Sequence, residues 1–361
     1  MPAGSDAVLR VGIAGYGVVG TQRHLFIDQD PRMTVVAISD LRHEQRLTNQ
    51  DLGPALFRRH EEMLEQARLD VLFVCIPPDV APGVTIDGLE AGLHVFCEKP
   101  PGRTVKDVQR VMEVEQQHPQ LKLKYGFNHR YHGSVQDALR IVRSGDLGEI
   151  INIRGVYGKS TMIPWPRLSA PAESLSSDRY WRTSRAVAGG GILLDQGIHM
   201  VDLMRVFAGE FVRIKSFVRN TFWGHDVEDN AYAIMESETG IIAMLHSTAT
   251  QWRHQFSLDM ALSNGSIVLS GFLSSTRSYG QETLTVQPAQ HDAPGNALDQ
   301  TTTYEDDHSW RDEITEFGDS ILFDRPIAMG SSVEALKTME LVYQIYCADE
   351  LWKQRFNLLT S

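Results

Sequence analysis

The sequence predicts an α/β protein of two domains: a doubly wound parallel sheet, then a second domain with a mainly antiparallel sheet. Three observations carry this prediction. The chain has 361 residues, which is too long for one ordinary hydrophobic core. Its first third alternates short apolar runs with helical segments, a pattern typical of parallel sheets. Its second half contains runs that alternate apolar and polar residues, as strands with one covered face do.

Composition narrows the class of protein. Apolar residues make up 42% and charged residues 22% of the chain, as in soluble globular proteins. A net charge of -12 argues against a nucleic-acid partner, because phosphate binding needs clustered cations. The odd number and wide spacing of Cys75, Cys97 and Cys347 favour free thiols in a reducing compartment. With neither a signal peptide nor an apolar run long enough for a bilayer, we expect a cytoplasmic protein without membrane contact.

A glycine motif follows the first predicted strand, at 8–14. A helix is expected over 21–30, and a second strand over 33–40 ends at Asp40, 20 residues beyond Gly20. A strand, a glycine turn, a helix and a later acidic residue at this distance indicate a dinucleotide-binding site. We therefore expect cofactor contacts from Gly15, Tyr16, Gly17, Val18, Val19, Gly20 and Asp40.

Each residue of this motif has a distinct expected role. Gly15 permits the tight turn, Gly17 lets the backbone approach a pyrophosphate, and Gly20 allows close helix packing. Asp40 would accept hydrogen bonds from a ribose diol and repel a 2′-phosphate, which favours NAD over NADP. Arg42 lies near enough in sequence to soften that preference. A glycine-rich turn without a ligand is the weaker interpretation.

The alternation of predicted strands and helices continues to residue 131. Strands are expected at 70–78, 93–100 and 121–131, and helices at 84–92 and 104–119, the latter beginning with a capping box of Thr104 and Asp107. Ile76 and Pro77 lie where the 70–78 strand ends, at the carboxyl edge where such sheets bind ligands, so we expect them to contact the cofactor.

The next strand ends in Glu98-Lys99-Pro100. A lysine at a strand end is usually a solvated charge. At the carboxyl edge of this sheet, however, Lys99 would face the nicotinamide and a bound substrate. A partly desolvated lysine loses proton affinity and can join a proton relay. We therefore expect Glu98 and Lys99 to bind the cofactor, and Lys99 also to bind substrate and take part in catalysis.

The segment 189–203, GGGILLDQGIHMVDL, places Asp195 and His199 four residues apart, on one face if the segment is a helix. It could be a plain helix, part of a metal site with Asp202, or an acid–base pair. A metal would need a further convergent ligand, so we expect none. Because glycine costs a helix interior about 1 kcal/mol, the glycines favour close approach of the backbone to a ligand or to the neighbouring domain.

The second domain is expected to start with a helix at 132–148 and a strand at 149–158. A long irregular segment, 159–188, follows and carries Trp181 and Arg182. A loop of this length is usually functional or disordered. It could form the wall of a sugar pocket or simply pack on its own tryptophans, and we expect Trp181 and Arg182 to bind substrate.

The rest of the chain supplies the second sheet and a final helix. The expected segments are strands at 211–220, 229–237, 240–252, 256–271 (with a turn at Asn264-Gly265) and 282–288, a polar excursion or lid at 291–310, and a helix at 331–354.

With GYGVVG, EKP and GGGILLDQGIH in this order, the sequence resembles the Gfo/Idh/MocA family, the relatives of glucose-fructose oxidoreductase and inositol dehydrogenase. The resemblance implies a Rossmann domain at 1–127. It also implies a substrate-binding and oligomerisation domain at 128–361, with an open, largely antiparallel sheet. The implied chemistry is NAD(P)-dependent oxidation or reduction of a sugar, cyclitol or nucleotide-sugar, by a homodimer or homotetramer.

The resemblance also implies site residues. Lys99, Asp195 and His199 match the catalytic positions, while Asn128 and Arg130 match the segment that approaches the nicotinamide, where we expect Asn128 to bind cofactor and Arg130 substrate. Our hypothesis is that His199, or a relay linked to Lys99, removes the hydroxyl proton of the substrate. Two alternatives remain: a glycosidase or epimerase that retains its NAD, and a non-catalytic NAD-binding regulator.

Overall fold

A computed structural model describes residues 8–41, 53–163, 180–273, 277–289 and 298–358. The chain divides into two compact units: Met1–Asn128 with Trp310–Lys337, and His129–Ser309 with Thr338–Ser361. The return of residues 310–337 to the first unit was not predicted from the sequence. Each unit has its own sheet.

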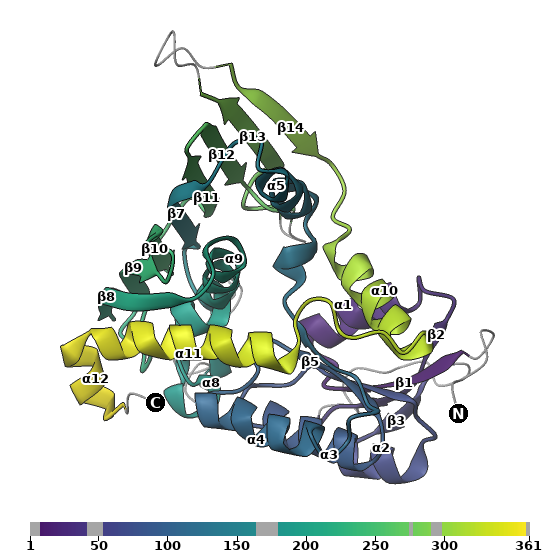
Figure 1. Cartoon of the computed structure of the whole chain (residues 1–361). Coiled ribbons are helices and arrows are strands. Elements are labelled where there is room, and N and C mark those ends of the chain that lie inside the picture. The colour runs from purple at the N-terminus through teal and green to yellow at the C-terminus, as the bar shows by residue number, and fades with distance from the viewer. Residues whose placement is uncertain (1–7, 42–52, 164–179, 274–276, 290–297, 359–361) are drawn as a thin grey trace. The chain divides into compact units, whose positions relative to one another are not determined.

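The first unit contains the predicted doubly wound parallel sheet (Figure 1). Its strands are β1 (Leu9–Ala14), β2 (Met33–Ser39), β3 (Ala55–Phe57), β4 (Val71–Val74), β5 (His94–Glu98) and β6 (Leu123–Gly126). They lie in the order β3-β2-β1-β4-β5-β6, and every pair is parallel. β4 is apolar and buried throughout, because helices cover both faces of such a sheet.

Among the described residues, five helices cover the first sheet: α1 (Val18–Ile27), α2 (His60–Gln66), α3 (Ala81–Glu90), α4 (Val105–Glu115) and α10 (Ser309–Leu322). α2, α3 and α4 lie on one face, and α1 and α10 lie on the other (Figure 1). Ile314 and Phe317 of α10 join the core formed by residues such as Val11 and Phe96. The predicted capping box of α4 is present. α1 begins three residues earlier than predicted, directly after Gly17.

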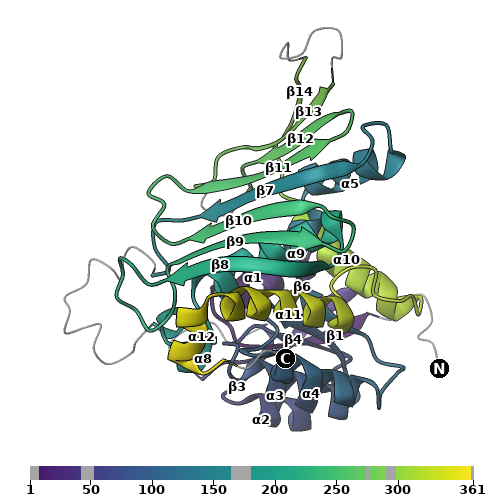
Figure 2. The same ribbon diagram turned by 60° about the vertical axis from the view of Figure 1, so that its left-hand side comes forward.

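The second unit contains a broad sheet (Figure 2). Its strands are β7 (Ile150–Gly158), β8 (Phe211–Arg219), β9 (Asn230–Ser237), β10 (Ile242–Thr248), β11 (Gln255–Leu262), β12 (Gly265–Ser270), β13 (Glu282–Pro288) and β14 (Gln300–Tyr304). They lie in the order β14-β13-β12-β11-β7-β10-β9-β8. Within the described residues, β7 and β10 form the single parallel pair, so the prediction of a mainly antiparallel sheet is confirmed.

The prediction of a polar excursion over 291–310 is wrong in part. Residues Gln300–Tyr304 form β14, which pairs antiparallel with β13. Three consecutive threonines explain this strand, because β-branched side chains favour extended backbone. Residues 290–297 lie outside the described part of the chain.

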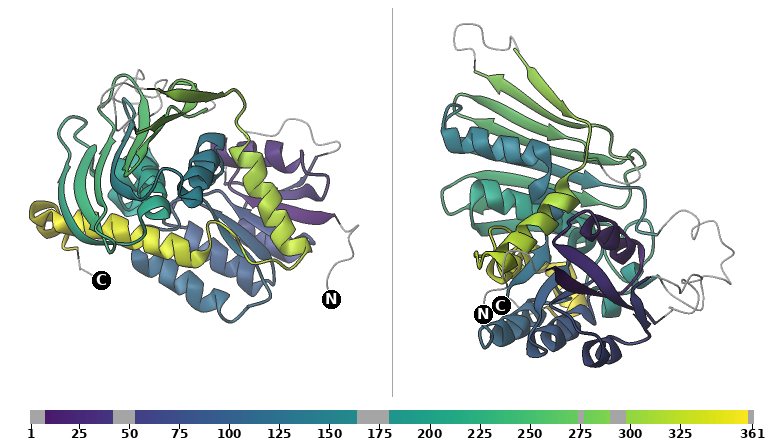
Figure 3. Two further views of the ribbon diagram at one scale, coloured as in Figure 1. Left: turned by 45° about the horizontal axis from the view of Figure 1, so that its top comes forward. Right: turned by 90° about the vertical axis from the view of Figure 1, so that its right-hand side faces the viewer.

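The described helices of the second unit are α5 (Gly133–Ser144), α8 (Arg185–Ala188), α9 (Ile198–Ala208), α11 (Ser332–Ala348) and α12 (Glu350–Phe356). Of α11, the residues from Thr338 onward belong to this unit. The sheet curves around α5 and α9, which lie on its concave face (Figure 3). The single helix predicted over 331–354 is broken at Asp349. This residue has extended backbone, and its carboxylate accepts a hydrogen bond from the backbone N–H of Trp352 at 2.9 Å, which starts α12.

Candidate active site

The glycine motif forms the turn between β1 and α1. Gly15 has a φ of 90°, a conformation that favours glycine, and a Cβ on Gly20 would lie 2.0 Å from the carbonyl oxygen of Gly15. A Cβ on Gly17, in contrast, would meet no heavy atom of the described residues within 4 Å. The fold therefore requires the first and third glycines, and the second leaves the backbone open to a ligand.

The N-terminus of α1 suits a bound phosphate. Its first turn has neither a side-chain cap nor an acidic residue, and Val18 at its start is 88% exposed. Uncapped N–H groups at a helix N-terminus attract anions. The motif residues thus fit the pyrophosphate of a dinucleotide.

Asp40 lies directly against this turn. Its Oδ2 accepts a hydrogen bond from the backbone N–H of Tyr16 at 2.9 Å, and the carboxylate is partly exposed. The acidic residue predicted from its position after β2 is therefore adjacent to the glycine motif.

The ends of β4 and β5 lie at the same carboxyl edge of the sheet, since neighbouring strands are parallel. Ile76 packs against the glycine turn, because a Cβ on Gly15 would lie 2.5 Å from its Cγ2. Pro77 follows it and is partly buried. Glu98 ends β5, and Lys99, also partly buried, follows it before a cis peptide bond to Pro100.

A buried charge cluster holds Glu98. Arg23 of α1 is fully buried and donates from Nε to Glu98 at 2.6 Å and from Nη2 to Glu313 of α10 at 2.7 Å. Its guanidinium also lies 4.3 Å from the ring centroids of Phe96 and Trp310. Burial raises the pKa of Glu313 to about 7 against the opposing effect of Arg23. The residue before Lys99 is thus tied to two helices.

In the second unit, the glycine-rich segment packs against its own domain. A Cβ on Gly190 would lie 2.3 Å from the Tyr346 hydroxyl, and a Cβ on Gly191 would lie 2.0 Å from the Glu228 carbonyl oxygen. A Cβ on Gly197 would lie 2.0 Å from the Ser247 hydroxyl. These close contacts explain the three glycines without a ligand, which corrects the sequence-based interpretation.

Glu228 anchors this segment. It is fully buried and accepts hydrogen bonds from the N–H groups of Gly191 at 2.8 Å and Leu193 at 3.0 Å, and from the Tyr346 hydroxyl at 2.6 Å. Burial raises the pKa of Glu228, although these hydrogen bonds oppose the effect. Glu228 could not be predicted from the sequence, because nothing in its neighbourhood distinguishes it from a surface glutamate.

Asp195 lies in a π-helical turn, Leu193–Gly197, that precedes α9, rather than in the α-helix predicted to present it beside His199. Such turns are rare in proteins overall, but many of those observed lie at functional sites. Its carboxylate is nearly buried and accepts hydrogen bonds from Lys159 Nζ at 3.2 Å and Arg182 Nε at 3.0 Å. Lys159 was not predicted, although its place directly after β7 resembles that of Lys99 after β5.

Arg182 lies among aromatic rings, as the sequence suggested. Its guanidinium is 4.1 Å from the Trp181 ring centroid, and Nη1 donates to the Tyr180 hydroxyl at 2.6 Å. Burial would lower the pKa of Arg182, but Asp195 and Tyr180 raise it above its usual value. Residues 164–179 of the predicted irregular segment lie outside the described part of the chain.

His199 is buried in α9 and stacks on His129, with ring centroids 3.8 Å apart. His129 belongs to the short helical turn Asn128–Tyr131 after β6, which also carries two predicted site residues. Asn128 is buried in the first unit. Arg130 of the second unit donates from Nε and Nη2 to Asp202, both at 2.7 Å. Asp202, once considered as a metal ligand, is therefore paired with an arginine.

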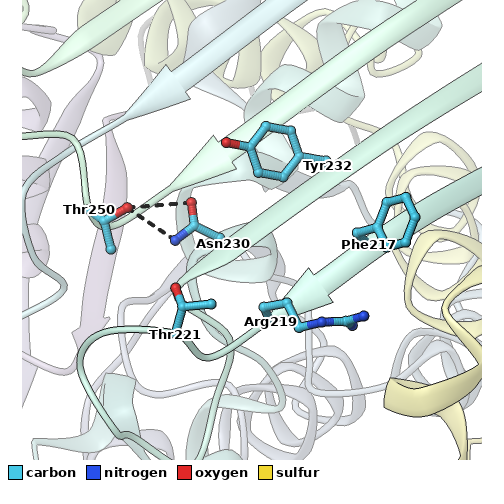
Figure 4. Close-up of a pocket in the computed structure, with 6 residues that line it drawn as sticks. All are labelled: Phe217, Arg219, Thr221, Asn230, Tyr232 and Thr250. Carbon is cyan, nitrogen blue, oxygen red and sulfur yellow. Dashed lines mark hydrogen bonds between the residues drawn. The ribbon is translucent and has the colours of Figure 1, made fainter.

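Three further observations concern the described part of the chain. Within the described residues, no group of three or more His, Cys, Asp or Glu side chains could hold a metal ion. A depression on the outward face of the second sheet contains none of the predicted site residues; its lining is Phe217, Arg219, Thr221, Asn230, Tyr232 and Thr250 (Figure 4). No helix of the described chain is long and apolar enough to cross a bilayer.

Together, the parallel sheet with its glycine turn and the separate antiparallel sheet define a dinucleotide-binding oxidoreductase of two domains. Residues 9–127 match the family model described as "Oxidoreductase family, NAD-binding Rossmann fold", and residues 135–268 match the GFO/IDH/MocA C-terminal domain. The chain belongs to the Gfo/Idh/MocA family. It is an NAD(P)-dependent dehydrogenase of the class that acts on CH–OH groups.

The chain is similar in sequence or fold to several named dehydrogenases. D-Glucoside 3-dehydrogenase of Escherichia coli K12 is 28% identical over 264 residues, which cover 68% of this chain and 71% of the relative. Inositol 2-dehydrogenase of Salmonella typhimurium LT2 is 24% identical over 240 residues, and this match spans 64% of this chain and slightly less than two thirds, 65%, of the relative. The structure of levoglucosan dehydrogenase with NADH and levoglucosan shares the fold, with a TM-score of 0.79, 19% identity, and coverage of 95% of this chain and 97% of that one.

Proposed function

We propose that this enzyme transfers a hydride between NAD and the CH–OH or ketone carbon of a sugar or cyclitol, with Lys99, Asp195 and His199 acting on the substrate. The observation that carries the proposal is the open backbone at Gly17 beside Asp40, in a chain that also buries Asp195 and His199 in its second unit. The first feature suits a dinucleotide, and the second suits proton transfer at a hydroxyl group.

The protein supplies proton transfer and orientation. When bound, NAD accepts the hydride in the oxidative direction and, in its reduced form, donates it in reverse. His199 or Lys99 takes the hydroxyl proton of the substrate, and the ammonium of Lys99 stabilises the developing oxyanion. Asp195, between Lys159 and Arg182, accepts a hydrogen bond from the substrate and orients it.

The relatives named above narrow the substrate class to sugars and cyclitols. Trp181 and Tyr180 offer aromatic faces beside Arg182, which suits the apolar face of a sugar ring. A nucleotide-sugar belongs to the same class of substrate, with Trp181, Arg182 and Arg130 as the proposed contacts.

A substrate screen tests the proposal. Purified enzyme is mixed with NAD⁺ or NADP⁺ and a panel of glycosides, inositols, sugar acids and nucleotide-sugars, and the reduced-nicotinamide absorbance is followed. We expect a sustained absorbance increase with at least one neutral sugar or cyclitol. A protein that binds the cofactor and turns over no polyol would be a regulator rather than a dehydrogenase.

We further propose that NAD is preferred over NADP, through the charge of Asp40. The Asp40→Asn variant removes that charge but keeps an acceptor for the Tyr16 N–H, so the turn stays intact. We expect the ratio of kcat/KM for NAD to that for NADP to fall by about 10- to 100-fold, because hydrogen bonds to charged groups contribute roughly 1.5–3 kcal/mol.

The matched control for this prediction is Asp28→Asn, which removes an exposed charge at the end of the same helix α1. We expect its cofactor ratio to equal that of the wild type. An unchanged ratio in Asp40→Asn would show that this carboxylate does not choose the cofactor.

We also propose that the outward face of the second sheet forms a homo-oligomer interface. Exposed apolar side chains lie close together across its strands. Phe217 lies opposite Tyr232, and Ile234 lies opposite Met244. Ile242, two residues before Met244 on β10, lies opposite Glu236. Exposed apolar patches of this kind mark interaction surfaces on soluble proteins. An exposed sheet face of this type can pair with its own copy around a two-fold axis.

The Ile234→Lys variant tests this interface, because it places a charge at the centre of the apolar row. We expect light scattering to give a dimer or tetramer for the wild type and a monomer for Ile234→Lys at the same concentration. Leu25→Lys changes an equally exposed leucine of α1 and is expected to keep the wild-type mass. A monomeric wild type would contradict the proposal.

A further inference from the structure

The imidazole ring of His199 lies face to face with a second imidazole. The ring centroids of His129 and His199 are 3.8 Å apart and their planes differ by 8°. Both side chains are buried, with exposed fractions of 9% and 4%. The two residues come from different elements of the second unit, the turn after β6 and helix α9.

Other contacts fix the plane of His129. Its Nε2 shares a hydrogen bond of 2.9 Å with the hydroxyl of Tyr157 on β7. The ring of Phe272 meets it edge to face, with centroids 4.5 Å apart and planes at 76°. His129 is thus held from two sides and presents a fixed flat surface to His199.

The stacked geometry determines what His129 can do. The N–H bonds and lone pairs of an imidazole lie in the plane of its ring. Two nearly parallel rings 3.8 Å apart therefore present their faces to each other and cannot exchange a proton through a direct hydrogen bond. The contact restricts the orientation of the His199 ring and transfers nothing.

We propose that His129 is a positioning residue that sets the plane of the His199 imidazole by ring stacking. This inference rests on the proposed function, in which His199 moves a proton at the substrate hydroxyl. A base must keep its nitrogen within hydrogen-bond reach of that proton, so a freely tilting ring would lower the rate of proton transfer.

Three variants separate stacking from proton transfer. His129→Ala removes the ring, and we expect kcat to fall by about 3- to 10-fold, in line with an aromatic pair energy of roughly 0.5–1.5 kcal/mol, with little change in KM. His129→Phe keeps a flat ring without a nitrogen, and we expect it to retain at least about half of the wild-type kcat. Because phenylalanine removes the His129 partner of the Tyr157 hydroxyl, a His129→Phe/Tyr157→Phe variant replaces both members of this hydrogen bond with rings that need none. The proposal would be overturned if both phenylalanine variants lost as much activity as His129→Ala.

An NMR readout tests the stacking independently of activity. In protein labelled with ¹³C-histidine, the Cε1–H signal that disappears in His199→Ala belongs to His199. A stacked ring shifts this signal upfield, and we expect the shift to be lost in His129→Ala and kept in His129→Phe. A His199 signal unmoved by His129→Ala would contradict the inference. A wild type inactive on every sugar, but with the upfield shift, would instead contradict the proposed function alone.

Discussion

Replacing His199 with alanine is expected to lower kcat by about 10²- to 10⁴-fold, the usual contribution of a general acid or base. The loss should fall on kcat rather than on KM, because the imidazole acts on the proton that moves in the transition state. Steady-state kinetics on the best substrate of the screen measure both constants.

Lys99 provides the companion measurement. Lys99→Ala should cost a comparable factor, and the Lys99→Ala/His199→Ala double variant should lose far less than the product of the two single losses, since the residues serve one proton transfer. His118→Ala is the control. This histidine lies in the turn between α4 and β6, at the edge of the sheet opposite the glycine turn, and bonds the Val114 carbonyl at 3.0 Å. Full activity in either single variant at Lys99 or His199 would refute the proposed roles.

The second large effect is expected at Glu228. Glu228→Ala leaves the N–H groups of Gly191 and Leu193 and the Tyr346 hydroxyl without their buried acceptor. Each such loss costs roughly 1–3 kcal/mol, and removing the desolvated carboxylate offsets part of the total, so we expect the free energy of unfolding to fall by about 3–5 kcal/mol. Urea denaturation followed by tryptophan fluorescence measures the change. Activity should fall as well, since the segment Glu228 holds leads into Asp195 and His199.

Glu236→Ala is the matched control for this prediction. Glu236 belongs to β9 and is close to Glu228 in sequence. Unlike Glu228, it forms an ion pair with an exposed side chain, that of Arg213. An exposed pair contributes about 0–1 kcal/mol, so this variant should unfold almost like the wild type. Equal stability losses at Glu228 and Glu236 would mean that the buried carboxylate does not anchor the glycine segment.

The glycine turn could be predicted from sequence because its determinants are local. Gly15 and Gly20 answer backbone requirements of a single turn, Gly17 lies between them, and Asp40 directly follows the next strand. Lys99 could be placed at the carboxyl edge for a similar reason, since it directly follows a strand of a parallel sheet. Such predictions need only the order of elements along the chain.

The surroundings of Asp195 and His199 could not be predicted in this way. Lys159 lies 36 residues from Asp195 in sequence, and His129 lies 70 residues before His199. The sequence favours a ligand or the neighbouring domain as the reason for the glycines at 190, 191 and 197, because their true neighbours, Tyr346, Glu228 and Ser247, are distant in sequence. Tertiary packing decides such contacts, and one sequence carries little trace of them.

Transfer of a label from the cofactor to the released product tests the central claim most directly. The enzyme is incubated with the ketone form of the substrate found in the screen and NADH carrying deuterium at the transferring C4 position. We predict one deuterium on the carbinol carbon of the released product for each NADH oxidised, with this transfer nearly abolished in His199→Ala. Turnover of a sugar without deuterium in the product, on a cofactor that never leaves the protein, would contradict the account and identify a glycosidase or epimerase instead.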